Sequence, residues 1–317
     1  MTDLTTRLAG LEFAGPVFTA SGCAAAGREL APYFDLASIG GVVTKSVMLA
    51  PRAGRATPRM AETPSGMLNS IGLQGPGIDT FLSTDLPWLA QRGVAAVVSI
   101  AGHSAEEYAA LARRLRDAPG LAMIEVNISC PNVESRGRVF ACSVDDAAAV
   151  VAAVRAEAEI PIFAKLSPDV TDLVSIARSC VAAGADGLSM INTLLGVAID
   201  PRTLRPVLSA VTGGLSGPAI KPVALRCIWQ VHAALPEVPI LGMGGVRSGR
   251  DALEFLVAGA SAVSVGTATF ADPTAPARVQ AELAAELTAR GFATVSEVIG
   301  LAHLKEAPVR EGGARAG

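Results

Sequence analysis

The chain has 317 residues, of which 50% are hydrophobic and 17% charged, with 32 glycines and a formal net charge of −3. This hydrophobic content excludes a disordered chain, because it supplies enough apolar surface for a large core. The weak negative charge, without a cluster of Lys and Arg, argues against nucleic acids and anionic membranes as partners. Small-molecule chemistry is therefore the default expectation.

Short β-rich segments alternate with helical segments along the chain. We expect eight strands, at residues 16–21, 41–46, 94–100, 122–128, 161–167, 187–192, 238–244 and 260–267. Apolar positions at helical spacing begin at Ala105, Val144, Val170, Pro218 and Gly249. Parallel strands that alternate with helices eight times predict an α/β protein, a (β/α)₈ TIM barrel with its core at about residues 8–300. An open, doubly wound sheet is the alternative that the pattern leaves.

Two connections are too long for simple βα loops. They are residues 47–77 after the second strand and 193–216 after the sixth, and both follow strand C-termini, where barrels carry their active sites. Within the first, residues 66–77 have the composition of a loop. Because no linker or internal repeat is present, we expect a single domain over residues 1–317.

The cell compartment is indicated by what the sequence lacks. The first ten residues contain Asp3 and Arg7 and no apolar signal run, and residues 255–271 are too interrupted by Gly, Ser and Thr to span a bilayer. The five cysteines are odd in number and contain no C-x-x-C pair, which argues against disulfides and against zinc or iron–sulfur sites. We expect a cytoplasmic protein without a metal site.

Polar residues gather at the predicted strand ends, where a pure core would be apolar. Lys45 and Lys165 lie in apolar strands, and because a buried lysine is costly without a partner, they indicate an anionic or carbonyl-rich ligand. The alternative is that each lysine extends to the surface. The three asparagines Asn69, Asn127 and Asn192 would suit a planar heterocycle with alternating N–H and C=O groups.

Glycines end the last two strands, in "LGMGG" and "SVGT", and a third glycine segment, "GGLSG", covers residues 213–217. This placement matches the phosphate site of many barrels, although glycine turns also occur for steric reasons. The string "GMGGVR" lacks the third glycine of a dinucleotide fingerprint, so no NAD site is predicted.

Cys130 follows the fourth strand, in "NISCPN". Its position leaves three readings: a buried hydrophobic residue, a base or a nucleophile. The other cysteines, Cys23, Cys142, Cys180 and Cys227, have structural positions. Of the histidines, His232 lies in a predicted helix, His303 lies near the C-terminus, and His103 is expected in a surface loop.

Taken together, the strings "ASGC", "VVTKSV", "TPRMAETPSGMLNSIGLQGPG", "NISCPN", "AKLSP", "GADGLSMINT", "GGLSGPAIKP", "GMGG" and "AVSVGTATFADP" resemble dihydroorotate dehydrogenase of the soluble class 1, from about residue 8 to residue 300. The resemblance implies an FMN enzyme of pyrimidine biosynthesis that oxidises dihydroorotate to orotate. Cys130 would remove the C5 proton while hydride leaves C6 for flavin N5.

The resemblance also implies the binding residues. The substrate would contact Lys45, Asn69, Ser70, Ile71, Gly72, Leu73, Asn127, Asn192 and Thr193. FMN would contact Ser21, Lys45, Ser46, Ser99, Asn127, Lys165, Ile191, Gly217, Gly244, Gly245, Gly266 and Thr267. Two features depart from the family pattern: Ser99 replaces a flavin-contacting Asn of many relatives, and "CAAAG" (residues 23–27) replaces a loop with aromatic and glycine residues.

Within class 1, the motifs look most like the catalytic subunit of the NAD-linked type (class 1B). That type is a heterotetramer around a homodimer core, in which a second subunit carries FAD and a 2Fe–2S cluster. Three other functions are left open: a dihydropyrimidine dehydrogenase catalytic subunit, a flavin-free aldolase with Lys165 as Schiff base, and a non-catalytic binding subunit.

Overall fold

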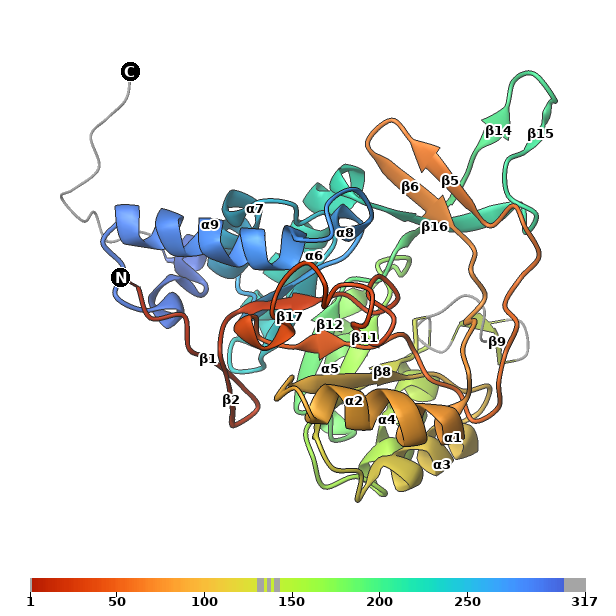
Figure 1. Cartoon of the computed structure of the whole chain (residues 1–317), viewed down its shortest axis with the longest axis horizontal. Helices are drawn as coiled ribbons and strands as arrows, with labels where there is room; N and C mark the ends of the chain where they lie inside the picture. The colour runs from red at the N-terminus through yellow and green to blue at the C-terminus, as the bar shows by residue number, and fades with distance from the viewer. Residues whose placement is uncertain (1, 130–133, 136–137, 140–142, 305–317) are drawn as a thin grey trace.

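Eight parallel strands form a closed barrel at the centre of the protein (Figure 1). The computed structural model describes residues 2–129, 134–135, 138–139 and 143–304. The barrel strands are β3 (Val17–Thr19), β4 (Val42–Val43), β7 (Ala96–Ile100), β8 (Leu121–Asn127), β11 (Ile162–Leu166), β12 (Gly187–Met190), β17 (Ile240–Met243) and β18 (Ala262–Val265). Their hydrogen-bonded order is β3-β18-β17-β12-β11-β8-β7-β4, and a bridge between Phe18 and Gly41 joins the two ends. The predicted (β/α)₈ barrel is confirmed.

Helices surround the barrel and confirm the five predicted helical segments. These are α3 (Ala105–Leu115), α4 (Val144–Arg155), α5 (Leu173–Ala182), α6 (Lys221–Ala234) and α7 (Gly249–Val257). Side chains cap the N-termini of four of them, since Ser104, Ser143, Asp172 and Ser248 each accept a hydrogen bond from a backbone N–H of the first turn. The caps explain why these helices begin where they do.

Further helical segments were not predicted. Residues 78–90 form one continuous helical stretch before β7, made of α1 (Ile78–Thr80), η2 (Phe81–Asp85) and α2 (Leu86–Ala90). After the last strand come α8 (Ala268–Ala271) and α9 (Ala275–Ala289), the latter packed against α7. Short turns lie at η1 (Leu36–Ser38), η4 (Pro218–Ile220), η5 (Val295–Val298) and η6 (Leu301–His303). No helix of the described residues is long and apolar enough to cross a bilayer.

The lower part of the barrel interior is apolar and closed. The hairpin of β1 (Thr6–Leu8) and β2 (Leu11–Phe13) places Leu8 and Phe13 in one cluster with Phe18, Phe163 and other residues near the strand N-termini. The rings of Phe13 and Phe18 meet edge to face at 5.2 Å. With this end filled, a ligand can enter the barrel only from the C-terminal ends of the strands.

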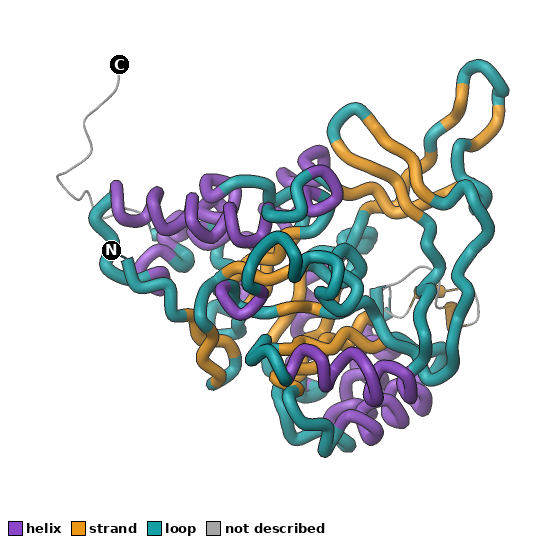
Figure 2. Tube along the Cα trace, viewed as in Figure 1, coloured by secondary structure: helices purple, strands orange, loops and turns teal. Residues whose placement is uncertain are grey.

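The two long insertions are joined in one antiparallel sheet. It contains β5 (Met60–Thr63), β6 (Gly66–Asn69), β13 (Leu194–Val197) and β16 (Thr212–Ser216) in the order β13-β16-β6-β5. The hairpin of β14 (Ile199–Asp200) and β15 (Arg205–Pro206) extends from it, away from the barrel (Figures 1 and 2). A separate short pair is formed by β9 (Glu134–Ser135) and β10 (Arg138–Val139).

The prediction of a loop at residues 66–77 is wrong for Gly66–Asn69, which form β6. This strand pairs with β16, about 150 residues later in the chain, through pairs such as Asn69 with Gly214. The residues around this strand are rich in Gly, Pro and Ser, so local propensity favours a loop. Pairing with the distant strand β16 makes the segment extended.

Candidate active site

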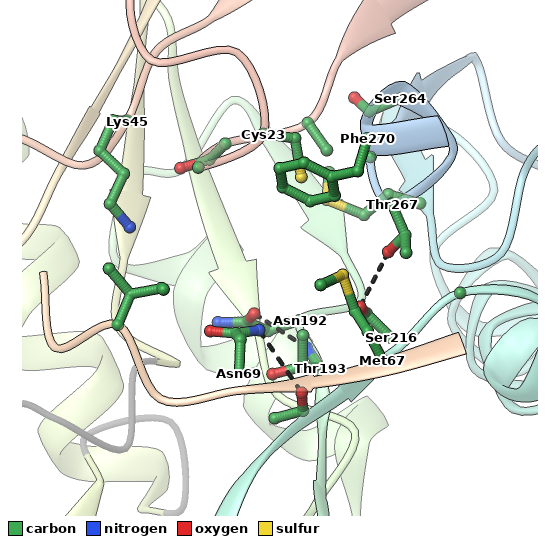
Figure 3. Close-up of a pocket in the computed structure, with 18 of the residues that line it drawn as sticks. Cys23, Lys45, Met67, Asn69, Asn192, Thr193, Ser216, Ser264, Thr267 and Phe270 are labelled. Carbon is green, nitrogen blue, oxygen red and sulfur yellow. Dashed lines mark hydrogen bonds between the residues drawn. The ribbon is translucent and has the colours of Figure 1, made fainter. Parts of the chain in front are cut away.

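A cavity of about 960 Å³ opens at the C-terminal ends of the barrel strands, between the barrel and the insertion sheet. Figure 3 shows Lys45, Asn69, Asn192 and Thr267 around this one cavity. Residues from both insertions and from the ends of most barrel strands line it. Its position is the one where (β/α)₈ barrels bind their ligands.

Most of the predicted site residues meet at this cavity. Its wall includes Ser21, Lys45, Ser46, Asn69, Ile71, Gly72, Leu73, Asn127, Lys165, Ile191, Asn192, Thr193, Gly217, Gly244, Gly245, Gly266 and Thr267. Ser70 and Ser99 are buried and do not line it. Cys130, the predicted base, lies outside the described residues. The structure therefore brings together residues that are spread over about 250 positions of the sequence.

A chain of hydrogen bonds orders the amides on one wall. Asn192 Nδ2 donates to Ser129 Oγ (2.8 Å), Ser129 Oγ donates to Asn127 Oδ1 (3.0 Å), and Asn127 Nδ2 donates to Ser46 Oγ (2.9 Å). Ser46 Oγ in turn lies 2.9 Å from Ser99 Oγ. Asn127 is bonded through both Oδ1 and Nδ2, and Asn192 Oδ1 also accepts from the backbone N–H of Thr193, so the orientation of each amide is fixed before any ligand binds. Ser129 is the link that the sequence alone did not single out.

Lys165 is buried and paired with a carboxylate. Its ammonium lies 3.3 Å from Oε1 of Glu125, and the two residues are 4% and 0% exposed. The alternative of a lysine that extends to the surface is therefore wrong for Lys165. Glu125 was missed in the sequence, although a glutamate between Ile124 and Val126 in an apolar strand was the available signal.

Several glycines form another part of the cavity wall. Gly217, Gly244 and Gly245 have φ of +95°, +124° and +93°, a region that disfavours any side chain. A Cβ on Gly217 would lie 2.7 Å from Gly66 Cα, so β6 and the start of α6 could not approach each other. Next to these glycines, Thr267 Oγ1 donates to Ser216 Oγ over 2.8 Å (Figure 3). These glycines, Ser216 and Thr267 offer backbone N–H groups and hydroxyls to a ligand, and none of them carries a negative charge.

The sequence matches one family along most of its length. The family model of dihydroorotate dehydrogenase matches residues 3–287. The chain belongs to the dihydroorotate dehydrogenase family. Curated relatives from Pelobacter propionicus (53% identical, covering 94% of this chain and 98% of the relative) and Desulforudis audaxviator (51%, 93% and 96%) are both called dihydroorotate dehydrogenase B (NAD(+)), catalytic subunit. A relative from Anoxybacillus flavithermus with the same name is 48% identical, over 95% of this chain and 96% of the relative. The resemblance noted in the sequence is confirmed.

Cys23, in the loop that departs from the dihydroorotate dehydrogenase pattern, needs a correction. We expected a structural cysteine, but the structure places it on the cavity wall, partly exposed and near Gly266. Desolvation raises the pKa of its thiol to about 11, and the positive charges of Lys165 and Lys45 oppose this shift. Cys180 and Cys227 are buried in α5 and α6, as expected, and Cys142 lies outside the described residues.

Arg52 is a cavity residue that sequence reasoning missed. Its Nε donates to the carbonyl of Gly72 (2.9 Å), and its Nη1 lies 3.1 Å from Nε2 of the exposed His103. The next residue, Leu73, has a φ of +56°, which is strained for a residue with a side chain, so the bond from Arg52 supports a strained turn. Other lining residues that we did not predict are Arg59, Met60, Met67, Arg247, Phe270 and Arg278. Among the described residues, no group of His, Cys, Asp and Glu is arranged to hold a metal ion.

Proposed function

We propose that this chain oxidises dihydroorotate to orotate in pyrimidine biosynthesis, with FMN bound in the cavity and Cys130 as the base. The observation that carries the proposal is the convergence of Asn69, Asn127 and Asn192 on one cavity that also contains Lys45 and Lys165. The names of the relatives point to the same substrate. We further propose that residues 1–317 act as one cytoplasmic domain.

The residues present fit FMN. The volume of about 960 Å³ is in the range of cofactor sites. The hydroxyl of Ser264, a cavity residue, is buried and has no hydrogen-bond partner among the described residues, so a polar ligand group could satisfy it. Gly217, Gly244, Gly245, Gly266 and Thr267 would hold the phosphate with backbone N–H groups and a hydroxyl, and Lys165 would lie near the flavin ring. When bound, FMN would accept the hydride from substrate C6.

The protein's own part in the reaction would be to hold the substrate and to move one proton. The three asparagines would pair with the alternating N–H and C=O groups of the ring, while Lys45 and the backbone of residues 70–73 would bind the carboxylate. Cys130 would take the C5 proton as a thiolate, so that loss of this proton and of the C6 hydride turns dihydroorotate into orotate. Its chain neighbour Ser129 is bonded to Asn127 and Asn192, which supports this placement.

We also propose an electron-transfer partner. The relatives are called catalytic subunits, a name that implies a second subunit, and we propose that it carries FAD and a 2Fe–2S cluster and passes electrons to NAD⁺. Exposed apolar residues of the insertion sheet and its hairpin support a subunit contact, and we propose a homodimer core there. They are Leu195, Val197, Ile199, Leu204 and Val211, each more than half exposed.

The deciding experiment is anaerobic reduction of the purified, FMN-loaded chain. We expect dihydroorotate to bleach the flavin rapidly, while dihydrouracil and NADH leave it oxidised. Bleaching by dihydrouracil instead would favour the dihydropyrimidine dehydrogenase alternative, and a chain that cannot bind FMN would contradict the proposal. Native mass spectrometry and co-purification from the source organism test the homodimer and the partner.

A further inference from the structure

Glu125 is a carboxylate buried inside the barrel, one layer below the cavity. It is 0% exposed and does not line the cavity, whereas its partner Lys165 is 4% exposed and does. The register explains this arrangement, because Lys165 pairs with Asn127 of β8 and Glu125 lies two residues earlier on the same strand, opposite Phe163. Both side chains therefore point into the barrel, with the lysine nearer to the ligand.

The surroundings of the pair are polar but incomplete. Oε2 of Glu125 has no hydrogen-bond partner among the described residues, and neither has the buried hydroxyl of Ser189. On β12, Ser189 lies beside Lys165 in the sheet register. The 3.3 Å contact with Lys165 is thus the described interaction that offsets the carboxylate's loss of hydration.

A buried ion pair of this kind needs a reason beyond stability. Replacing such a pair by apolar residues is often neutral or stabilising, whereas removing one partner leaves an uncompensated charge. In a barrel whose other interior residues are largely apolar or neutral, one carboxylate next to one ammonium changes the local charge from +1 to 0. This difference acts on whatever lies above Lys165, because charges in a dry interior are weakly screened.

We propose that Glu125 is a positioning residue that offsets the charge of Lys165 and thereby lowers the reduction potential of the bound flavin. The inference rests on the proposed function, because it needs FMN next to Lys165. Reduction adds negative charge to the flavin ring, so the ammonium of Lys165 favours reduction and the carboxylate of Glu125 opposes it. The pair sets the driving force of electron transfer both from the substrate and onward to the acceptor.

The test is the midpoint potential of the bound flavin in wild type and variants, measured by spectroscopic redox titration of the FMN-loaded chain. We expect Glu125→Gln, which keeps the shape and removes the charge, to raise the ratio of reduced to oxidised flavin at the wild-type midpoint at least tenfold, or about 30 mV for a two-electron couple. Glu125→Asp keeps the charge and should stay near the wild type. An unchanged or lowered potential in Glu125→Gln would overturn the proposal.

A control separates this local effect from the total charge of the chain. Glu157→Gln also removes one carboxylate, but from a partly exposed cluster with Arg113 and Arg116 outside the barrel. Its potential should equal that of the wild type, because solvent screens it. A shift as large as that of Glu125→Gln would contradict a specific role for Glu125.

A second pair of variants keeps the proposal testable if Glu125→Gln alone does not fold. Lys165→Met should lower the potential, and Glu125→Gln combined with Lys165→Met, which leaves no buried charge, should fold and lie above Lys165→Met. Equal potentials in these two variants would refute the role of Glu125. A wild-type chain that binds no FMN would contradict the proposed function itself. A potential that is unchanged in Lys165→Met but shifted in Glu125→Gln would mean that the flavin does not lie next to Lys165.

Discussion

Asn192 and Ser129 lie 63 residues apart in sequence and share a hydrogen bond of 2.8 Å from Nδ2 to Oγ. The first follows β12 and the second follows β8, so the bond crosses the mouth of the barrel over β11. Through Ser129, the amide of Asn192 is connected to that of Asn127. The two amides that would read the substrate ring are thus held by one hydroxyl.

Ser129→Ala should uncouple these amides. Removing the hydroxyl leaves one group of each amide, Asn127 Oδ1 and Asn192 Nδ2, without its partner, which costs about 1–3 kcal/mol. We expect lower stability and a higher KM for dihydroorotate, with FMN content unchanged. Thermal denaturation and steady-state kinetics measure both effects. Ser83→Ala removes an exposed hydroxyl that donates to the Thr80 carbonyl, and this variant serves as the control. Equal behaviour of the two variants would mean that Ser129 does not order the site.

Cys130→Ala should keep the fold and bound FMN but lose most dihydroorotate oxidation. Loss of a general base typically costs about 10²- to 10⁴-fold in rate. Cys130→Ser should also be slow near neutral pH, because a hydroxyl is a much weaker base than a thiol with an ordinary pKa of about 8.5. Single-turnover flavin reduction across pH is the measurement. If Cys130→Ala reduced its flavin at the wild-type rate, with the wild-type pH profile, the cysteine would be a packing residue.

The barrel could be predicted from the sequence because each of its elements has a pattern within a short segment of the chain. Each strand and helix has its own apolar period, and eight repeats of the pattern leave few alternatives. Strand-end residues such as Lys45 and Asn192 were readable for the same reason. Contacts between distant segments were not: Glu125 as the partner of Lys165, Ser129 as a link, and β6 as a strand all depend on residues brought close only by folding.

Gly217→Ala should weaken FMN binding more than a comparable glycine substitution elsewhere. At this position φ is +95° and the new Cβ would lie 2.7 Å from Gly66 Cα, so both the backbone and β6 must shift. Gly10→Ala is the matched control, because φ is +81° there and nothing lies within 4 Å of a new Cβ. Both variants should lose about 1–2 kcal/mol from the left-handed backbone. Only Gly217→Ala should lose FMN affinity in a fluorescence titration. A loss of equal size in both variants would refute the proposal that Gly217 helps to hold the FMN phosphate.

The thiol of Cys23 should report on occupancy of the cavity. Because its pKa is raised to about 11, we expect slow alkylation at pH 7 that accelerates as the pH rises toward 11. Saturating FMN should suppress this reaction, and the buried Cys180, whose pKa is raised to about 12 by burial, should stay unlabelled. Peptide mapping by mass spectrometry assigns the labelled residues. Equal labelling of Cys23 with and without FMN would place the flavin elsewhere.

Stability should fall in mild acid through His232. Burial and the nearby His303, whose ring centroid is 4.8 Å away, lower the pKa of His232, while Glu237 opposes the shift. Below the ordinary pKa of about 6.5, the unfolded chain binds a proton that the folded chain does not, so unfolding becomes easier as the pH falls. We expect a smaller drop in Tm between pH 7.5 and pH 5.5 for His232→Gln than for the wild type. Identical slopes would contradict the assignment.

Because β6 pairs with β16, the two insertions are expected to evolve together. One insertion follows the second barrel strand and the other the sixth, yet Asn69 and Gly214 are neighbours in one sheet, and a side chain at residue 214 would collide with Thr193. In a hybrid that takes one insertion from another family member and keeps the other, the contact between β6 and β16 would fit only by chance. Recombination and loop grafting between such barrels should therefore succeed when both segments travel together, and substitutions on one side of this contact should be accompanied by changes on the other.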